Sequence, residues 1–388
     1  MSPFFIFFFL SLPIVSLSKT TNPITPISSK PPTPPIVGIT ITNHTITNTL
    51  IISTLQTLKI THVRLPDSNP DTIRAFSYTN ISLLLSIPNS FIPEISSNRS
   101  KALKWLNTHV IPFYPRVRIT VISVGNDILD YNNNLSVLLL PAINNVHQGL
   151  GELGIHNKIL VSTTFSFINV ISPMFFPPSS ATFQVIITET LIKPLLKFLA
   201  RTNSSFLVNV YPYHIYWSHS EIPIGYALFQ ENSFNFRDDL MTGVRYRNLF
   251  DTMVDGVVTA MGALGYEDIP LIVTETGWPS QGGEREIDAT KIYAEMYLKG
   301  LVRHLRSGLG TPLRRDGVAE TYVFELLDEE GTQKGVESKK HWGVLYQNLS
   351  RKYDFDFSSA AGKHDECERC VIFLVLLILL TILLIWFW

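Results

Sequence analysis

The sequence of 388 residues contains only two cysteines, Cys367 and Cys370, and both lie near its C-terminal end. No disulfide can therefore staple residues 1–366, and a core formed there must hold by packing alone. The pair in "CERC" resembles a redox or zinc motif, but a lone pair beside an apolar tail is weak support for either. Palmitoylation is the better alternative if that tail is retained.

An excess of charge of either sign is also absent, because 31 lysines and arginines stand against 32 aspartates and glutamates. The net charge of −1 gives no electrostatic reason to expect nucleic acid or an anionic membrane surface as a partner. The ten histidines form no HExxH motif or other ligand cluster, so we expect neither a metal nor a cofactor. No serine-centred nucleophile elbow is evident.

The N-terminal end carries a short hydrophobic run, "FFIFFFLSLPIVSL", followed by small residues. This pattern predicts a secretory signal peptide over residues 1–18. A buried helix or a membrane anchor is the alternative, but the run is short for a membrane span. Residues 19–35 are rich in proline, serine and threonine and predict a spacer without a packed core.

The C-terminal end has a longer run, residues 371–388, with no lysine or arginine after it. Small residues and a polar stretch precede it over residues 358–370. A small site, a polar spacer and an apolar tail are typical of a glycosylphosphatidylinositol (GPI) signal, in which the tail is removed. We favour this lipid anchor over a retained membrane helix, which would place the protein on the outer face of the plasma membrane or in the cell wall. The expected attachment residues are Ser358, Ser359 and Ala360.

Sequons for N-glycosylation support export to the cell surface. A single Asn-x-Ser/Thr triplet arises easily by chance, but several on a chain with a signal peptide are consistent with a glycoprotein. The predicted acceptor residues are Asn43, Asn80, Asn98, Asn134, Asn203 and Asn348.

Between the two ends, short apolar runs alternate with amphipathic stretches. Most of the runs are solid valine, isoleucine and leucine, which indicates strands buried on both faces of a parallel sheet. Eight strand–helix units predict a single (β/α)₈ TIM barrel over residues 36–357, with an open doubly wound sheet as the alternative. No glycine-rich phosphate loop follows the first strand to support that alternative. The expected strands are 36–41, 60–65, 81–87, 119–125, 158–163, 206–213, 270–275 and 321–327, and the clearest helices are 100–114, 135–154, 247–265 and 288–308.

Two carboxylates follow strands of this predicted barrel. The run "VISVGNDILD" leads into Asn126 and Asp127 after the fourth strand, and "TETGWPS" places Glu275 after the seventh. An acid at a strand end is more often a cap or a solubilising group than a catalyst. Because functional residues collect at the C-terminal ends of barrel strands, however, these two should face each other across the mouth. Paired carboxyls about 5–5.5 Å apart are the machinery of retaining glycoside hydrolysis.

Amides and aromatic rings are expected beside the two acids. The sixth strand, "NVYPY", places Asn209, Tyr211 and Tyr213 on or near the rim, and Trp278 follows the seventh strand. These rings could stack on sugar faces, although an aromatic residue near a strand end is more often part of the core.

The segment "LIVTETGWPS" closely resembles the signature of glycoside hydrolase family 17, the plant endo-1,3-β-glucanases. The likeness extends over residues 36–357 and includes "FLVNVYPYHIY" and "KKHWGVLY" in matching order. The resemblance implies a TIM barrel that hydrolyses β-1,3-glucan with retention. It makes Glu275 the nucleophile, places the acid/base at Asp127 and has Asn126 help to hold the sugar. Further expected sugar contacts are Phe324, Glu329 and Lys334.

The chain departs from the family pattern in its groove. The family's acid/base is a glutamate, and aspartate sets the carboxyl back by roughly 1–1.5 Å. Such a displacement can cost on the order of 10²-fold in rate. Family tyrosines after the first two strands are replaced here by Ile41-Thr42 and by Pro66-Asp67. Lys334 lies five residues after Glu329 rather than three, which leaves its role open.

Two functions from different classes follow. The first is a secreted or cell-surface endo-hydrolase of β-1,3-glucan that acts as a monomer. The second is a glucan-binding surface protein that kept the barrel and lost most of its turnover. A weaker variant of the first cleaves mixed β-1,3/1,4-glucan, which groove shape decides.

Overall fold

The computed structural model describes residues 35–42, 45–131, 133–173, 175–232, 234–328 and 341–357, with backbone only at residues 131, 133 and 134. The predicted signal peptide, all of the spacer but Pro35, the anchor region with Ser358, Ser359 and Ala360, and the C-terminal tail lie outside these ranges. So do Asn43, Glu329 and Lys334 and the side chain of Asn134.

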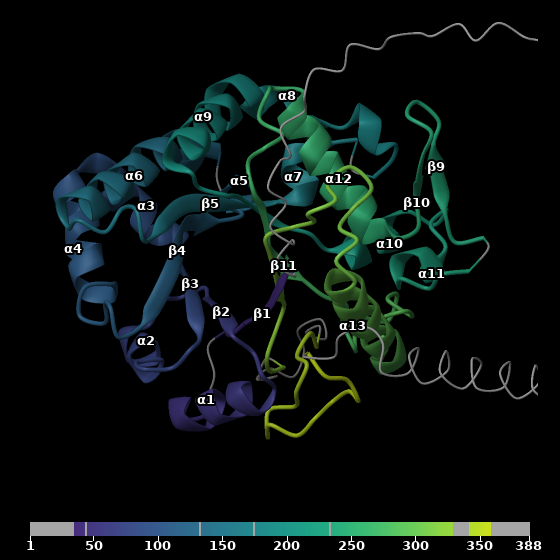
Figure 1. The fold of residues 1–388 in the computed structure, drawn as a ribbon, viewed down its shortest axis with the longest axis horizontal. Helices are drawn as coiled ribbons and strands as arrows, with labels where there is room; N and C mark the ends of the chain where they lie inside the picture. Colours follow the sequence, from purple (N-terminus) through teal and green to yellow (C-terminus); the bar gives the residue numbers. More distant parts are fainter. Residues whose placement is uncertain are drawn as a thin grey trace, which may run out of the picture. The chain divides into compact units, whose positions relative to one another are not determined.

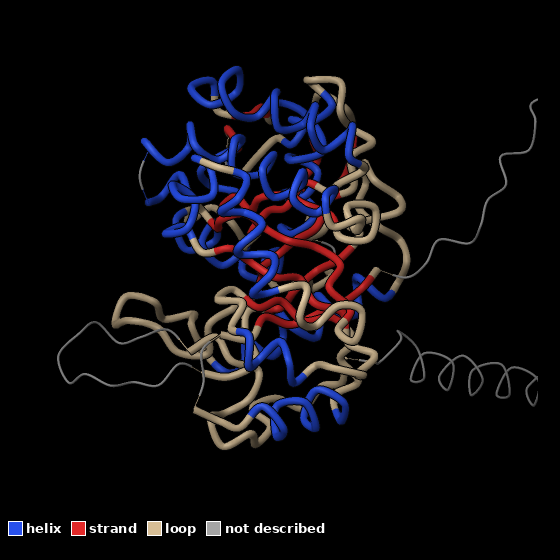
Figure 2. Tube along the Cα trace, turned by 90° about the vertical axis from the view of Figure 1, so that its left-hand side faces the viewer, coloured by secondary structure: helices blue, strands red, loops and turns tan. Residues whose placement is uncertain are grey.

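Eight parallel strands close into a barrel, which confirms the predicted architecture (Figure 1). β1 pairs with both β2 and β12, so the sheet has no free edge and the open doubly wound alternative is wrong. Figure 2 shows the strands gathered centrally with helices around them. The barrel strands are β1 (Ile36–Thr40), β2 (His62–Leu65), β3 (Ser82–Ile87), β4 (Arg118–Asn126), β5 (Leu160–Ser166), β8 (Phe206–Asn209), β11 (Leu271–Thr276) and β12 (Glu320–Val323).

The predicted strands all occur, but two of them end four residues earlier than expected. The sixth barrel strand stops at Asn209 rather than Tyr213, because Pro212 begins helix α10 (Pro212–Ser218). Proline suits the first turn of a helix and cannot donate to a strand ladder. The eighth strand stops at Val323 instead of Leu327.

Helices cover the outside of the barrel. The four predicted stretches correspond to α4 (Arg99–His109), α6 (Asn133–Glu152), α12 (Leu249–Gly262) and α13 (Lys291–Arg306). Gly154 follows α6 with a φ of 73°, the left-handed conformation in which a glycine commonly ends a helix. Thr290 caps α13, since its side-chain oxygen accepts the backbone N–H of Tyr293. The other α-helices are α1 (Asn48–Thr57), α2 (Pro70–Ala75), α3 (Ile92–Ser97), α5 (Ile128–Tyr131), α7 (Phe167–Val170), α8 (Val185–Ile187), α9 (Lys193–Thr202) and α11 (Ile224–Ala227).

Short elements decorate the loops outside the barrel. Two antiparallel pairs join β6 to β7 and β9 to β10. Within the described ranges, none of the helices has the length and hydropathy that crossing a bilayer requires. These further elements are η1 (Asn89–Phe91), β6 (Ile171–Ser172), η2 (Pro178–Ser180), β7 (Thr182–Phe183), η3 (Thr188–Ile192), β9 (Arg237–Asp239) and β10 (Val244–Tyr246).

Buried apolar side chains form two clusters, because successive side chains of a strand point to opposite faces. The larger cluster fills the space between strands and helices. The smaller one fills the barrel interior, where Tyr322 packs against Gly38 with no room for a further Cβ atom. The interior is thus a packed core rather than a pore, so a ligand must bind at the mouth. The interior cluster consists of Leu84, Val121, Leu207, Ile272 and Tyr322.

The strand register brings the predicted polar residues to one side of this mouth. Asn126 pairs with Thr164 across β4 and β5, and Asn209 pairs with Glu275 across β8 and β11. Since β5 and β8 are also neighbours, four adjacent strands deliver these side chains to one edge.

Candidate functional site

The backbone that carries Asp127 is bent out of the regular ladder. The register between β4 and β5 shifts between Ser123 and Asn126, Gly125 has a φ of 80°, and Asp127 has a φ of 47°. A Cβ atom on Gly125 would lie 2.8 Å from the Cδ1 atom of Ile92, so any other residue there must displace a neighbouring side chain and adopt a backbone conformation that favours glycine. Aspartate is among the residues that tolerate the left-handed region, whereas a longer side chain adopts it less readily.

Asn89 holds this bend in place from the neighbouring η1. Its side-chain amide donates to the carbonyl oxygen of Asn126 at 2.8 Å and accepts the backbone N–H of Asn126 at 2.9 Å. Both backbone groups freed by the bulge are therefore satisfied, which stabilises the bend.

The Asp127 carboxyl is asymmetrically bonded. Its Oδ2 atom accepts N–H groups from Asn209 at 2.8 Å and from Asn126 at 3.3 Å. Its Oδ1 atom is buried and has no hydrogen-bond partner among the described residues. Burial, followed by the nearby charge of Glu275, raises the pKa of Asp127 to about 7, although the Asn209 hydrogen bond opposes this shift. Near neutral pH this group can therefore hold a proton or release it.

Glu275 is the penultimate residue of β11, and both of its carboxylate oxygens have a partner. Its Oε1 atom forms an ion pair with the Nη1 group of Arg64, whose side chain is fully buried. Its Oε2 atom accepts the Tyr211 hydroxyl at 2.7 Å. The two contacts fix the orientation of this carboxylate, as a nucleophile requires.

Three further side chains link the two acids into one network. The Nη2 group of Arg64 donates to Oδ1 of Asn126 at 2.8 Å, and Asn209 reaches the same oxygen at 3.2 Å. Thr274 in turn donates to Oδ1 of Asn209 at 2.8 Å. A continuous set of hydrogen bonds thus runs from Glu275 through Arg64, Asn126 and Asn209 to Asp127, with no intervening apolar wall.

Sequence reasoning did not identify Arg64. It lies within β2, in the run "ITHVRL", where an apolar residue would be expected. A charged residue inside a buried strand needs a partner of opposite charge. This requirement could have identified Arg64 as a candidate site residue from the sequence.

Two of the predicted aromatic residues lie inside the wall of the site rather than at its surface. Tyr213 and Trp278 are each 1% exposed. The Tyr213 hydroxyl donates to Glu286 at 3.0 Å, and the Trp278 indole N–H donates to the carbonyl oxygen of Asp288 at 2.9 Å. These bonds secure the loop after β11, and neither ring offers a free face to a ligand.

A different set of rings is partly exposed beside Glu275. Tyr211, Phe324 and Trp342 are each partly buried. The Tyr211 ring lies edge-on to Trp342 at 5.2 Å and to Phe324 at 6.2 Å, between ring centroids. Trp342 was absent from the predicted contacts because it lies far from any strand end in the sequence. The three rings, hereafter the aromatic platform, present a surface suited to an apolar sugar face.

The two positions where family tyrosines are replaced border a polar cavity of about 250 Å³. Thr42 and Asp67 line it together with Asn48, Asn69 and Asp71. The rim beside β1 and β2 therefore offers hydroxyl, amide and carboxylate groups in place of aromatic rings.

The remaining predicted residues divide by position. Among the described sequons, Asn80, Asn98, Asn203 and Asn348 are exposed, as acceptors must be. Among the described residues, no group of three or more histidine, cysteine, aspartate or glutamate side chains could hold a metal ion. The roles proposed for Glu329 and Lys334 stay predictions.

The chain is similar in sequence to a family of known proteins. Residues 39–357 match the profile of glycosyl hydrolases family 17. Glucan endo-1,3-beta-glucosidase 12 of Arabidopsis thaliana is 36% identical over 305 residues, which cover 78% of this chain and 56% of that protein. The probable glucan endo-1,3-beta-glucosidase A6 of the same plant is 39% identical over 312 residues, which cover 79% and 64% respectively. The chain thus spans less than two thirds of the length of these relatives.

Two solved structures resemble the chain closely. A β-1,3-glucanase and allergen of Cryptomeria japonica pollen has a TM-score of 0.77 and 33% identity, covering 83% of this chain and 99% of that one. One of two plant β-glucan endohydrolases with distinct substrate specificities has a TM-score of 0.73 and 31% identity, covering 82% and 99%.

Proposed function

The chain belongs to glycosyl hydrolases family 17, and on that premise we propose that it hydrolyses internal β-1,3 linkages of a β-1,3-glucan. The activities for which its relatives are named support the linkage. The observation that carries the proposal is that one hydrogen-bond network joins two carboxyl groups in different electrostatic surroundings. Glu275 is paired with a buried guanidinium, whereas the pKa of Asp127 is raised to about 7.

The proposed mechanism is a double displacement with retention. Glu275 attacks the anomeric carbon while Asp127 donates its proton to the departing glycosidic oxygen, so the glycosidic bond breaks as the glycosyl–Glu275 ester forms. Asp127, now a carboxylate, then takes a proton from water. The resulting hydroxide equivalent attacks the anomeric carbon and releases Glu275.

The surrounding residues have separate tasks in this scheme. Arg64 and Tyr211 hold the nucleophile, and Asn126 and Asn209 hold the acid at its Oδ2 atom. With Oδ2 accepting two N–H groups, the proton of the neutral carboxyl sits on the buried Oδ1 atom, and the carboxyl must turn toward the mouth to deliver it. The aromatic platform stacks on the sugars beside the cleaved bond, and Glu329 and Lys334 contribute further sugar contacts.

A direct test measures reducing ends released from a linear, unbranched β-1,3-glucan. We expect Glu275→Gln to lose at least about 10³-fold in kcat. It should keep its affinity for the glucan in a binding assay, because the amide retains the shape of the side chain. Equal hydrolysis by wild type and variant would reject Glu275 as the nucleophile.

The second candidate, a glucan-binding protein with weak turnover, is favoured by one feature. Asp127 is a methylene shorter than the family's glutamate, and its Oδ2 atom is already held by two amides. Asp127→Glu discriminates between the two readings. A sharp gain in cleavage over a wild type that only binds supports the binding protein, whereas a wild type that already turns over well supports the hydrolase.

We also propose that the mature protein is a glycosylated monomer, anchored by lipid on the outer face of the plasma membrane or held in the cell wall. The terminal sequence patterns support this location. A phospholipase specific for GPI anchors should release the protein from intact cells into the medium. Retention after that treatment, with residues 371–388 still present by mass spectrometry, would favour the membrane helix.

A further inference from the structure

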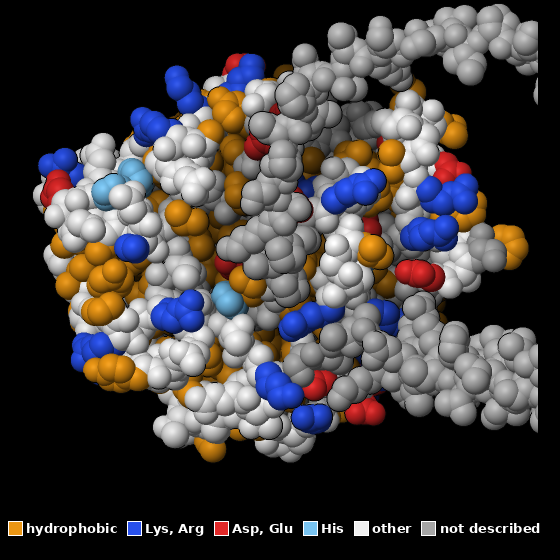
Figure 3. All heavy atoms as spheres, viewed as in Figure 1, with side chains coloured by type: hydrophobic (Ala, Val, Ile, Leu, Met, Phe, Trp, Pro, Cys, Tyr) orange, Lys and Arg blue, Asp and Glu red, His pale blue; other side chains and the backbone are white. Residues whose placement is uncertain are grey.

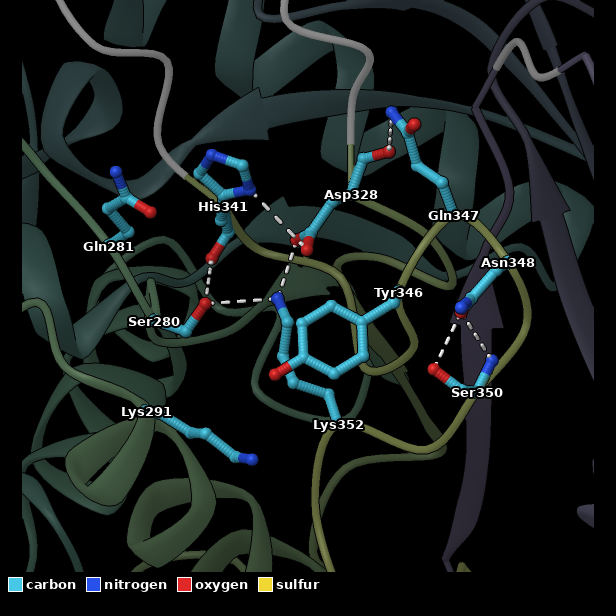
Figure 4. A pocket seen from close by; sticks show the side chains of 10 residues that line it. All are labelled: Ser280, Gln281, Lys291, Asp328, His341, Tyr346, Gln347, Asn348, Ser350 and Lys352. Atoms are coloured by element: carbon cyan, nitrogen blue, oxygen red, sulfur yellow. Dashed lines mark hydrogen bonds and ion pairs between the residues drawn. The ribbon is translucent and has the colours of Figure 1, made fainter.

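A second cavity, of about 790 Å³, lies beside the barrel mouth and outside the catalytic network. Its walls come from the loop after β11, the start of α13, Asp328 beyond the end of β12, and the segment over residues 341–352 (Figure 4). Its lining side chains include Gln281, Lys291, Asp328, Tyr346, Gln347 and Lys352.

The charges in this cavity do not cancel. Lys352 is buried and donates to Asp328 at 2.6 Å and to Ser280 at 3.0 Å, so its charge is matched. Lys291 is exposed and makes no ion pair with any described carboxylate. Burial lowers the pKa of Lys352, and repulsion by Lys291 acts in the same direction. Among the described residues that line the cavity, two lysines therefore stand against one aspartate. This excess is local, since lysine and arginine side chains elsewhere lie in small separate groups on the face shown in Figure 3.

The other lining groups suit a sugar better than a simple ion. The Tyr346 ring is 40% exposed and lies 5.9 Å from the Lys291 ammonium and 5.5 Å from that of Lys352. The amides of Gln281 and Gln347 add donors and acceptors at the same cavity. Its volume falls in the range of pockets that hold a ligand of several rings, far larger than an inorganic anion needs.

We propose that this cavity binds a carboxylate-bearing oligosaccharide, in which a uronate group pairs with Lys291 and a neighbouring ring stacks on Tyr346. A charge-assisted bond to an ammonium and an aromatic contact together discriminate an acidic sugar from a neutral one. The inference does not depend on glucan hydrolysis, because none of the lining residues belongs to the catalytic network.

Backbone hydrogen bonds nevertheless connect the walls of this cavity to the aromatic platform. The backbone N–H of Ser280 donates to the carbonyl oxygen of His341 at 2.7 Å, and the His341 N–H donates to that of Gln281 at 3.2 Å. His341 lines the cavity, and the next residue, Trp342, belongs to the platform. A bound acidic sugar would thus place the protein on an acidic polysaccharide while leaving the catalytic mouth available.

The test titrates trigalacturonate, a uronate trisaccharide, into the full chain produced without N-glycans and measures heat of binding at low salt. We expect saturable binding that weakens by about tenfold or more in Lys291→Gln and survives in Lys291→Arg. Lys299→Gln is the matched control, because Lys299 lies on the same helix but pairs with Glu295 outside the cavity. It should bind as wild type does.

Three results would overturn the proposal. The first is equal affinity for the same trisaccharide with its carboxyls reduced to alcohols. The second is equal weakening in Lys291→Gln and Lys299→Gln, which indicates diffuse charge attraction only. The third is loss of binding in Glu275→Gln, which places the probe in the catalytic mouth. Normal trigalacturonate binding by a chain that fails to cleave glucan would reject the hydrolase and leave this site standing.

Asn348 offers an internal check, because this predicted glycosylation site also lines the cavity. Its Oδ1 atom accepts the backbone N–H of Ser350 at 3.0 Å. Chain made in a glycosylating host should bind trigalacturonate more weakly if Asn348 carries a glycan, and Ser350→Ala should restore binding. Unchanged affinity in a chain shown to be glycosylated at Asn348 would contradict the placement of the sugar at this cavity.

Discussion

Asn209 donates its side-chain N–H to Oδ2 of Asp127 at 2.8 Å, from a strand that pairs directly with the strand of Glu275. This contact ties the acid to the strand next to the nucleophile, although the two acids are far apart in the chain. It also lowers a pKa that burial and Glu275 raise. The Asn209 amide therefore helps to position the short acid and also shifts its pKa downward.

The pH dependence of hydrolysis should follow Asp127. Because the proton donor must be protonated in the free enzyme, kcat/KM should fall as the pH rises through about 7. Asn209→Ala removes a bond that favours the carboxylate, so the descending limb should move to higher pH. A pH series on a linear β-1,3-glucan measures both. A limb that stays in place in Asn209→Ala would contradict the assigned role of this amide.

Stability should depend on pH through the same group. The pKa of Asp127 is raised in the folded state, from 3.8 to about 7, so the folded protein retains a proton that the unfolded chain loses. Its contribution is fully present below pH 3.8 and is lost as the pH rises toward 7. Asp127→Asn should therefore raise Tm on the order of 2–4 °C at pH 8 and change it little at pH 4.

Part of the dependence of Tm on pH should remain in Asp127→Asn. Asp255, buried in α12, also has its pKa raised to about 7, chiefly by burial, and contributes with the same sign. Scanning calorimetry of wild type and Asp127→Asn across this pH range separates the two contributions. A Tm difference that is constant with pH would indicate that Asp127 is not protonated in the folded state.

Arg64 should be required for both folding stability and catalysis. Arg64→Met leaves Glu275 as a buried charge without its partner, which should cost about 3–5 kcal/mol in the free energy of unfolding. The double variant Arg64→Met/Glu275→Gln should recover most of this loss, since the unpaired charge is then gone. Denaturant titration measures the recovery. If the double variant is as unstable as Arg64→Met, packing rather than charge explains the effect.

The bend at Gly125 can be tested against a glycine with similar backbone conformation. Gly125 and Gly154 have φ values of 80° and 73°, but only at Gly125 does a Cβ atom meet other atoms within 4 Å. Either alanine variant should lose about 1 kcal/mol of stability for the left-handed backbone. Gly125→Ala should in addition lower kcat by on the order of 10²-fold, because it displaces Asn126 and Asp127. Equal activity in the two variants would show that the bend tolerates this displacement.

Loss of one ring from the aromatic platform should weaken substrate binding. Trp342→Ala should raise KM for a β-1,3-glucan oligosaccharide by roughly tenfold, equivalent to about 1.4 kcal/mol, with a smaller effect on kcat. Trp278→Phe should lower Tm without a comparable rise in KM, because the Trp278 ring is buried in the wall. Initial rates over a range of oligosaccharide concentrations measure the two constants. A rise in KM confined to Trp278→Phe would reverse this assignment.

Much of the site could be anticipated because it is tied to strand ends. Asp127 and Glu275 follow apolar runs, and parallel strands deliver their ends to one edge. Asn209 and Tyr211 were expected for the same reason, and the structure places both against the two acids. Residues contributed from elsewhere escaped this reasoning. Arg64 lies inside a strand, and Trp342 reaches the mouth from a segment beyond the last strand of the barrel.

The linear sequence predicted the succession of strands and the two acids, and it contains the glycine before Asn126. Such predictions are possible because periodicity and strand ends are local properties. The folded chain alone decides which rings face the substrate and which carboxyl keeps a proton. It also decides that Lys291 and Lys352 line the same cavity. Exposure, desolvation and charge pairing depend on neighbours brought close by barrel closure, and no local pattern records them.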